Sequence, residues 1–154
     1  MADSPDSLFL QATCVAVDGL GVLLRGPSGG GKSDLALRLI DGGARLVADD
    51  GVELSRRGDD LVARLPAMAP DSVRGRIEVR GLGILPVPSV DDAIVGLVVD
   101  LVAANKIERL PLPATVDLLG LSIPVIDLAG PEPSAPAKVR LAVRLVKRSI
   151  IRPS

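Results

Sequence analysis

Eight consecutive residues in this chain have the types and the order that hold a phosphate chain in many proteins. They follow the pattern Gly-x-x-x-x-Gly-Lys-Ser and are Gly26, Pro27, Ser28, Gly29, Gly30, Gly31, Lys32 and Ser33. Glycines let the backbone curve around an anion with its N–H groups pointing inward. Lys32 then supplies a charge for the β- and γ-phosphates, and the Ser33 hydroxyl supplies a ligand for Mg²⁺. The residues predict a site for ATP and Mg²⁺, against the alternative of a glycine-rich turn with a chance lysine.

Two adjacent acids, Asp49 and Asp50, follow a short apolar run at residues 46–48. In enzymes with a phosphate loop, an acid at the end of a strand holds the magnesium directly or through water. One acid is enough for that task, so the second carboxylate is free to accept the proton of an attacking hydroxyl. Without the preceding loop, a solvated Asp-Asp-Gly turn would be the simpler interpretation.

The elements that must position these residues follow from the spacing of apolar residues. Residues 8–17 and 21–24 are rich in strand formers and are joined by Asp-Gly, which predicts a β-hairpin leading into the loop. Apolar residues recur at helical spacing over 35–40, and Gly-Gly then ends the helix. We expect residues 46–48 to form a buried strand beside the loop. This order is that of a βαβ nucleotide-binding unit.

Further elements are predicted downstream. Residues 52–54 and 61–63 suit a hairpin, 67–75 a loop, 77–79 a short strand, 94–101 and 123–128 core strands, and 131–136 a rigid loop. Ser134 is a suitable N-cap for a final helix, in which Val139, Ala142, Val143 and Val146 form an apolar stripe among basic residues. That helix either covers the sheet with a solvated cationic face or docks an acidic partner or a neighbouring subunit.

The chain length predicts one domain, residues 1–154, with a loose tail at 1–7 and a core at about 8–151. Its 18 basic and 19 acidic residues nearly cancel, and Phe9 is its only aromatic residue, which argues against nucleic-acid binding. Without histidine and with one cysteine, it has no Ser-His arrangement, disulfide or cysteine metal cluster. The acidic start and the absence of an apolar run long enough for a membrane predict a cytoplasmic protein.

Three segments together resemble the catalytic domain of bacterial HPr kinase/phosphorylases: the phosphate loop, Arg-Leu-Val-Ala-Asp-Asp at 45–50, and Ile-Glu-Val-Arg-Gly-Leu-Gly-Ile at 77–84. The last is the most diagnostic. The resemblance covers about residues 8–151 and implies an α/β fold, a P-loop-containing domain with a mixed central sheet flanked by helices, as in phosphoenolpyruvate carboxykinase. The family phosphorylates a serine of the phosphocarrier protein HPr, and many members reverse the reaction. We expect a short form that has only the catalytic domain.

The resemblance also implies roles for individual residues. Lys32 and Ser33 match the phosphate-loop lysine and the magnesium-binding serine. Asp50 matches the base that acts on the acceptor serine, while Asp49 and Glu78 match magnesium ligands.

Other positions match less closely or depart from the family pattern. Arg109 matches a catalytic arginine, although taken alone it reads as a surface residue, and Arg80, Gly81 and Gly83 belong to the segment used in both reaction directions. Gln11 stands where the family has a histidine, and the segment linked to dephosphorylation is not recognisable, which argues against phosphorylase activity.

The function predicted on these grounds is an ATP-dependent protein-serine kinase that acts on HPr or its nitrogen-system relative, in regulation of the phosphotransferase system. The resemblance further implies a hexamer. Two alternatives stay open: a nucleotide sensor that has lost phosphoryl transfer, and a small-molecule kinase or NTPase.

Overall fold

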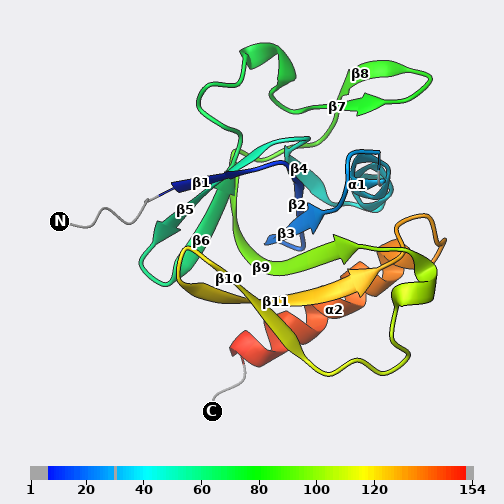
Figure 1. The fold of residues 1–154 in the computed structure, drawn as a ribbon. Helices are drawn as coiled ribbons and strands as arrows, with labels where there is room; N and C mark the ends of the chain where they lie inside the picture. Colours follow the sequence, from blue (N-terminus) through cyan, green and yellow to red (C-terminus); the bar gives the residue numbers. More distant parts are fainter. Residues whose placement is uncertain (1–6, 30, 152–154) are drawn as a thin grey trace.

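The predicted phosphate loop joins a strand to a helix in the middle of a mixed sheet (Figure 1). The structure is a computed structural model that describes residues 7–29 and 31–151. The sheet consists of β1 (Ser7–Leu10), β2 (Thr13–Val17), β3 (Leu20–Arg25), β4 (Arg45–Ala48), β5 (Val52–Arg57), β6 (Asp60–Arg64), β9 (Asp92–Leu101), β10 (Ala114–Leu118) and β11 (Leu121–Leu128). The other elements are β7 (Arg76–Val79) and β8 (Gly83–Pro86), the helices α1 (Lys32–Asp41) and α2 (Ala135–Ile151), and two 3₁₀ turns, η1 (Asp71–Val73) and η2 (Ala104–Lys106).

The long strand β9 organises the sheet, whose hydrogen-bonded order is β1-β5-β6-β9-β3-β2-β4. On one side, β9 pairs in parallel with β3 over most of the length of β9. Its first residues also pair antiparallel with β6, and its last residues pair in parallel with β11, which continues to β10. The sheet therefore branches at β9, and the phosphate loop leaves β3 next to the carboxyl end of β9.

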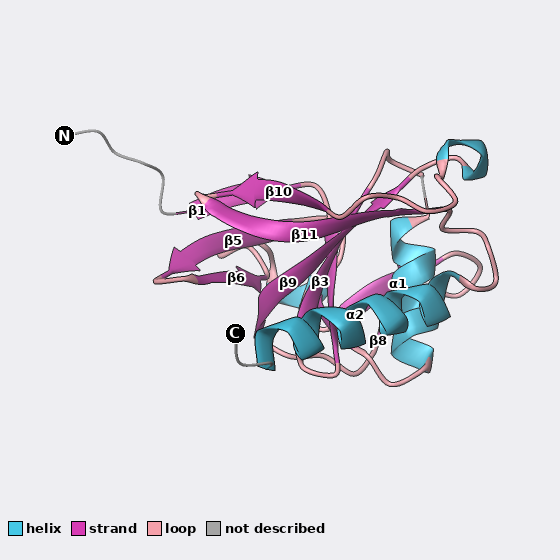
Figure 2. Ribbon diagram, turned by 90° about the horizontal axis from the view of Figure 1, so that it is seen from below, coloured by secondary structure: helices cyan, strands magenta, loops and turns pink. Residues whose placement is uncertain are grey.

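The two faces of the central strands bury separate apolar clusters, because successive side chains on a strand point to opposite faces. Val22 and Leu24 of β3 pack with Leu35 of α1 and Val139 of α2. Leu23 lies in the other cluster, which contains no helix residue and is built mainly from strands, among them β5, β6, β10 and β11. Both helices thus cover one face, and the branches of the sheet curl over the other (Figure 2).

The predicted strand over residues 8–17 was wrong, because the chain bends at Gln11 and Ala12 and separates β1 from β2. Both sides of β2 are occupied, by β3 and β4, so β1 turns away to the open side of β5. The hairpin across Asp18 and Gly19 is confirmed, and both residues have positive φ angles of 51° and 82°. β1 begins at Ser7, the last residue of the predicted tail; residues 1–6 lie outside the described residues.

The helix, the acid-bearing strand and the second hairpin agree with the prediction. α1 buries Leu35, Ala36 and Leu39, and β5 pairs with β6. β2 lies between β3 and β4 and runs antiparallel to both, so the two strands of the βαβ unit are parallel but not adjacent.

The final helix also agrees, whereas β8 and β10 were missed. α2 buries Val139 and Val143, and the carbonyl of Ser134 accepts the Lys138 N–H at 2.9 Å, in the position of an N-cap. β8 carries no buried residue, and β10 is mostly exposed, so neither has a strong apolar signal. In the described part of the chain, no helix is long and apolar enough to cross a membrane.

Candidate phosphate-binding site

The loop between β3 and α1 has the backbone shape that an anion site needs. Gly29 and Gly31 have positive φ angles of 76° and 95°, and nothing lies within 4 Å of where a Cβ would stand on either. The carbonyl of Gly31 accepts the Leu35 N–H at 2.9 Å, which starts α1 and leaves the positive end of the helix facing the loop. Gly30 lies outside the described residues.

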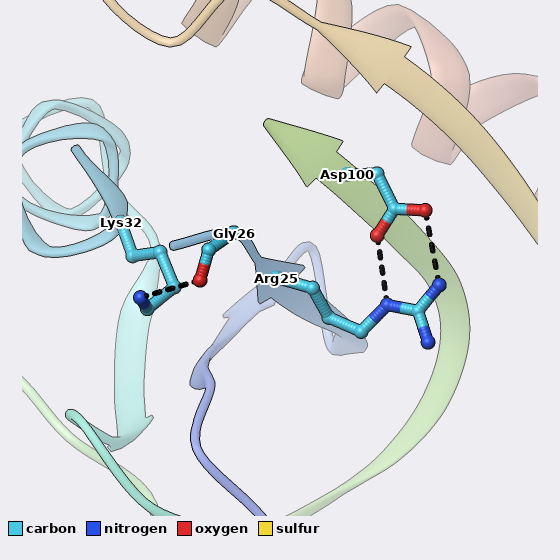
Figure 3. A network of polar contacts seen from close by, with 4 residues as sticks. All are labelled: Arg25, Gly26, Lys32 and Asp100. Carbon is cyan, nitrogen blue, oxygen red and sulfur yellow. Dashed lines mark hydrogen bonds and ion pairs between the residues drawn. The ribbon is translucent and has the colours of Figure 1, made fainter. Parts of the chain in front are cut away.

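Lys32 is the charged group of this loop and is only 9% exposed. Its ammonium donates hydrogen bonds to the carbonyls of Gly26 at 2.9 Å and Pro27 at 3.1 Å. A buried ammonium is costly unless it has such partners. The loop therefore holds the lysine head group against its own backbone, and Figure 3 shows the contact with Gly26.

Arg25 and Asp100 tie the start of the loop to β9. The guanidinium donates two hydrogen bonds to the carboxylate, from Nε to Oδ1 at 2.7 Å and from Nη2 to Oδ2 at 3.0 Å, and this pairing raises the pKa of Arg25 (Figure 3). The next residue, Gly26, lies so close to β9 that an added Cβ would be 3.2 Å from Cβ of Leu101. The ion pair and this close packing fix where the loop leaves the sheet.

The acid pair meets the loop through hydroxyl groups. Ser33 donates to Oδ1 of Asp49 at 2.7 Å, and Thr13 on β2 donates to the same oxygen at 3.0 Å. The N–H of Asp50 donates to the Thr13 hydroxyl at 3.3 Å, and Asp50 itself is in the left-handed region with a φ of 59°. The structure thus brings together Asp49 and Ser33, the two residues expected to bind magnesium. Sequence reasoning missed Thr13, although a lone hydroxyl in the apolar strand Thr-Cys-Val-Ala-Val was a visible signal.

A cleft of about 520 Å³ opens in front of the loop. The hairpin β7–β8 borders it, with Glu78 on β7 and Arg80 at the start of the turn. That turn is closed by a hydrogen bond from the N–H of Leu82 to the carbonyl of Val79 at 2.9 Å, and Gly81 and Gly83 take positive φ angles of 94° and 109°. The cleft is lined chiefly by Ser28, Gly29, Lys32, Ser33, Asp49, Asp50, Glu78 and Arg80.

A second hollow of about 460 Å³ shares Asp49, Asp50 and Glu78 with the cleft. Its other walls are mostly apolar and include Phe9, Leu65, Met68, Val73 and Ile84. The three acids therefore line both hollows.

The donor set suits a hard cation that binds oxygen. Within residues 7–29 and 31–151, no three or more acidic, cysteine or histidine side chains are grouped closely enough to hold a metal. Mg²⁺ usually keeps several waters and binds phosphate oxygens alongside only one or two protein ligands. Ser33 and Asp49 suit it for this reason, and a complete set of protein ligands is not needed. Glu78 lines the cleft, but it does not form a group of three metal-binding side chains with the other acids described.

Two of the predicted polar side chains, Gln11 and Arg109, are not brought into the cleft. Gln11 is exposed at the bend between β1 and β2, and Arg109 is exposed in the segment after η2. Neither lines the cleft or the second hollow.

Residues 6–129 match the family model of the HPr Serine kinase C-terminal domain. An HPr kinase/phosphorylase of Prosthecochloris aestuarii is 41% identical over 144 residues, covering 83% of this chain and 42% of the relative. One from Bordetella pertussis is 45% identical over 116 residues, covering 68% of this chain and 37% of the relative. The chain therefore spans less than half the length of these curated relatives.

A solved structure described as the Hpr(Ser) kinase/phosphatase from Coxiella burnetii superposes on this fold with a TM-score of 0.79. The two chains are 31% identical, and the match covers 93% of this chain and 92% of the other. This likeness confirms the predicted fold class, a P-loop-containing mixed sheet with flanking helices like that of phosphoenolpyruvate carboxykinase.

Proposed function

The chain belongs to the family of HPr serine kinase C-terminal domains, and from this we propose that it transfers the γ-phosphate of ATP to a serine of HPr or of its nitrogen-system relative. The observation that carries the proposal is the hydrogen bond from Ser33, in the first turn of α1, to Asp49 at the end of β4. It brings together, beside an open phosphate loop, the two groups that a phosphotransferase uses for its magnesium.

The loop and α1 would bind the triphosphate. Backbone N–H groups, the positive end of the helix and the Lys32 ammonium all oppose the negative charge that spreads over the γ-phosphate oxygens during transfer. Arg80 lines the same cleft and adds a second cation there. Mg²⁺, held by Ser33 and Asp49, would neutralise charge between the phosphates.

Asp50 is the group that we propose accepts the proton of the acceptor serine. As the serine oxygen forms a bond to the γ-phosphorus, the bond from that phosphorus to the bridging oxygen of ADP breaks. The hydroxyl proton passes to the Asp50 carboxylate. Asp50 suits this role because it is exposed and lines both the cleft and the second hollow.

The second hollow offers the acceptor a route that the nucleotide does not use. The attacking and leaving oxygens must lie roughly in line through the phosphorus, so the acceptor has to approach from the side opposite ADP. A hollow that adjoins Asp50 and is walled by Phe9, Met68 and Ile84 suits a protein segment with apolar side chains around its serine.

We propose transfer from ATP to the acceptor only, without the reverse reaction. By the family resemblance Gln11 stands in place of a histidine; its amide neither takes nor gives a proton at neutral pH, and it lies outside the cleft. The same residue motivates a second candidate function, a nucleotide-binding module without transfer activity.

Labelled ATP and purified HPr test the proposal directly. We expect the wild-type protein to label HPr on serine and Asp50→Asn to lower the rate at least about a hundredfold, since general base catalysis supplies about that much. Asp59→Asn, an exposed acid in the turn between β5 and β6, is the matched control and keeps the wild-type rate. Nucleotide binding without transfer would favour the sensor, and ATP turnover indifferent to HPr would favour a small-molecule kinase or NTPase.

A further inference from the structure

Thr13 is a hydroxyl residue buried in an apolar strand. It is 0% exposed, as are its neighbours Cys14 and Val15 on β2. Burying a hydroxyl is unfavourable unless it finds hydrogen-bond partners, and valine would fill the same space without that cost. The reason for a threonine here must lie in its partners.

Those partners are the two acids of the cleft. The Thr13 hydroxyl donates its single proton to Oδ1 of Asp49 at 3.0 Å. A hydroxyl oxygen also has lone pairs to accept with, and one accepts the N–H of Asp50 at 3.3 Å. One buried atom therefore joins the carboxylate of the first acid to the backbone of the second.

The contact to Asp49 restricts how its carboxylate can rotate. Ser33 donates to the same oxygen at 2.7 Å, from the side of α1. Two donors on different elements, β2 and α1, thus converge on one oxygen of the acid. Because Ser33 gives its proton to Asp49, its own lone pairs stay available to a cation.

The contact to Asp50 holds an unusual backbone. A residue with a side chain is strained in the left-handed region, although Asp tolerates it better than most. The N–H bond to Thr13 supports the φ of 59° at Asp50. This turn ends β4 and presents the Asp50 side chain to the two hollows.

We infer that Thr13 is a positioning residue: its buried hydroxyl locks the metal-binding acid and the proton-accepting acid into one unit, although it lines neither hollow. The roles of the acids rest on the proposed function, whereas the hydrogen-bonded unit does not. Removing the hydroxyl should therefore loosen the Asp50 backbone and weaken magnesium-dependent nucleotide binding together.

Thr13→Val removes the hydroxyl and keeps the shape of the side chain, and Thr13→Ser keeps the hydroxyl. Cys14→Ala is the matched control, because it alters the next buried position on the same strand without touching the acids. Thermal melting identifies any variant that fails to fold. If Thr13→Val fails to fold, Thr13→Ser still tests the inference.

The first measurement is amide hydrogen exchange in the free protein, which needs no nucleotide. We expect the Asp50 amide to exchange at least about tenfold faster in Thr13→Val than in the wild type, and Thr13→Ser and Cys14→Ala to match the wild type. Equal Asp50 exchange in wild type and Thr13→Val, or faster exchange in Thr13→Ser, would overturn the inference.

The second measurement is the affinity for a fluorescent ATP analogue with Mg²⁺ and with EDTA. Residues that orient metal ligands commonly change metal affinity by 10–100-fold. We expect Thr13→Val to weaken binding about tenfold with Mg²⁺ and to leave it unchanged in EDTA. An equal loss in both conditions would mean a purely structural role and overturn the inference. A wild-type protein that binds the analogue but never phosphorylates HPr would refute the kinase proposal and leave the Thr13 inference standing.

Discussion

Thr13 and Lys32 are the buried polar side chains of the described part of the chain, and both lie at the candidate site. Each finds its partners within the site: the lysine bonds to two carbonyls of its own loop, and the threonine bonds to the acid pair. Proteins rarely bury a lysine without such partners. At the scale of single residues, the polar groups that the fold buries are those that shape the phosphate loop and the acids.

The burial of Cys14 should make the stability of the fold depend on pH. Burial raises the pKa of its thiol from 9.0 to about 12, although a backbone hydrogen bond with Val22 works against this. The unfolded chain then ionises at a lower pH than the folded one, so the protonated thiol stabilises the fold fully below pH 9 and less as the pH rises toward 12. We expect the free energy of unfolding to fall by about 1 kcal/mol per pH unit across that window.

Urea unfolding at several pH values, for the wild type and for Cys14→Ala, measures this contribution. The variant lacks the thiol and should show a shallower loss of stability above pH 9. Native Cys14 should also resist thiol reagents at pH 8, because only the thiolate reacts. Identical slopes for the two proteins, or rapid labelling of the folded wild type, would contradict the prediction.

At the scale of elements, the contact between β3 and β9 decides where the loop stands. Gly21 lies so close to β9 that an added Cβ would be 2.9 Å from the carbonyl oxygen of Ile94. An added Cβ at Gly96 would be 2.5 Å from the Leu20 side chain. The two glycines let the strands pack closely at the start of β3.

This geometry predicts different costs for two similar substitutions. Gly21→Ala meets backbone that cannot move without breaking the pairing, so we expect it to lower the free energy of unfolding by about 1–3 kcal/mol. Gly96→Ala meets the end of a side chain that can change rotamer, and it should cost less. Chemical denaturation of both variants gives the comparison, and the reverse order would show that the strands are not held this closely.

At the scale of the whole molecule, the cleft is built from elements that are far apart in the chain. The loop follows β3, the acids follow β4, Thr13 lies on β2, and the hairpin β7–β8 brings Glu78 and Arg80. A nucleotide in this cleft would contact the loop, the acids and the hairpin at once, and Thr13 only through the acids. It should therefore stabilise the entire fold rather than one loop.

Thermal melting with and without Mg·ATP measures this coupling. At a nucleotide concentration about a hundred times the Kd, binding adds about 2.7 kcal/mol, which corresponds to a rise in Tm of roughly 5–10 °C for a chain of this size. Lys32→Ala should abolish most of the rise, because the ammonium is the loop's main charge for the phosphates. A rise of the same size in Lys32→Ala would place nucleotide binding somewhere other than the loop.

The sequence by itself determined the parts that depend on near neighbours. The glycine pattern, the helical spacing of Leu35 to Ile40 and the Asp-Gly turn act over a few residues, and each appears in the structure as predicted. The resemblance to the HPr kinase family came from the same kind of short motif.

Only the tertiary structure decided which distant residues meet. Thr13 and Asp49 are 36 residues apart, and Arg25 and Asp100 are 75 apart. β1 pairs with β5 and not with its sequence neighbour β2, because both sides of β2 are paired with β3 and β4. Which strand pairs at a given sheet edge depends on all the strands of the chain that could pair there. A sequence pattern of a few residues does not show which of them does. The phosphate loop could therefore be predicted from the sequence, whereas the contacts of the buried Thr13 with the two acids could not.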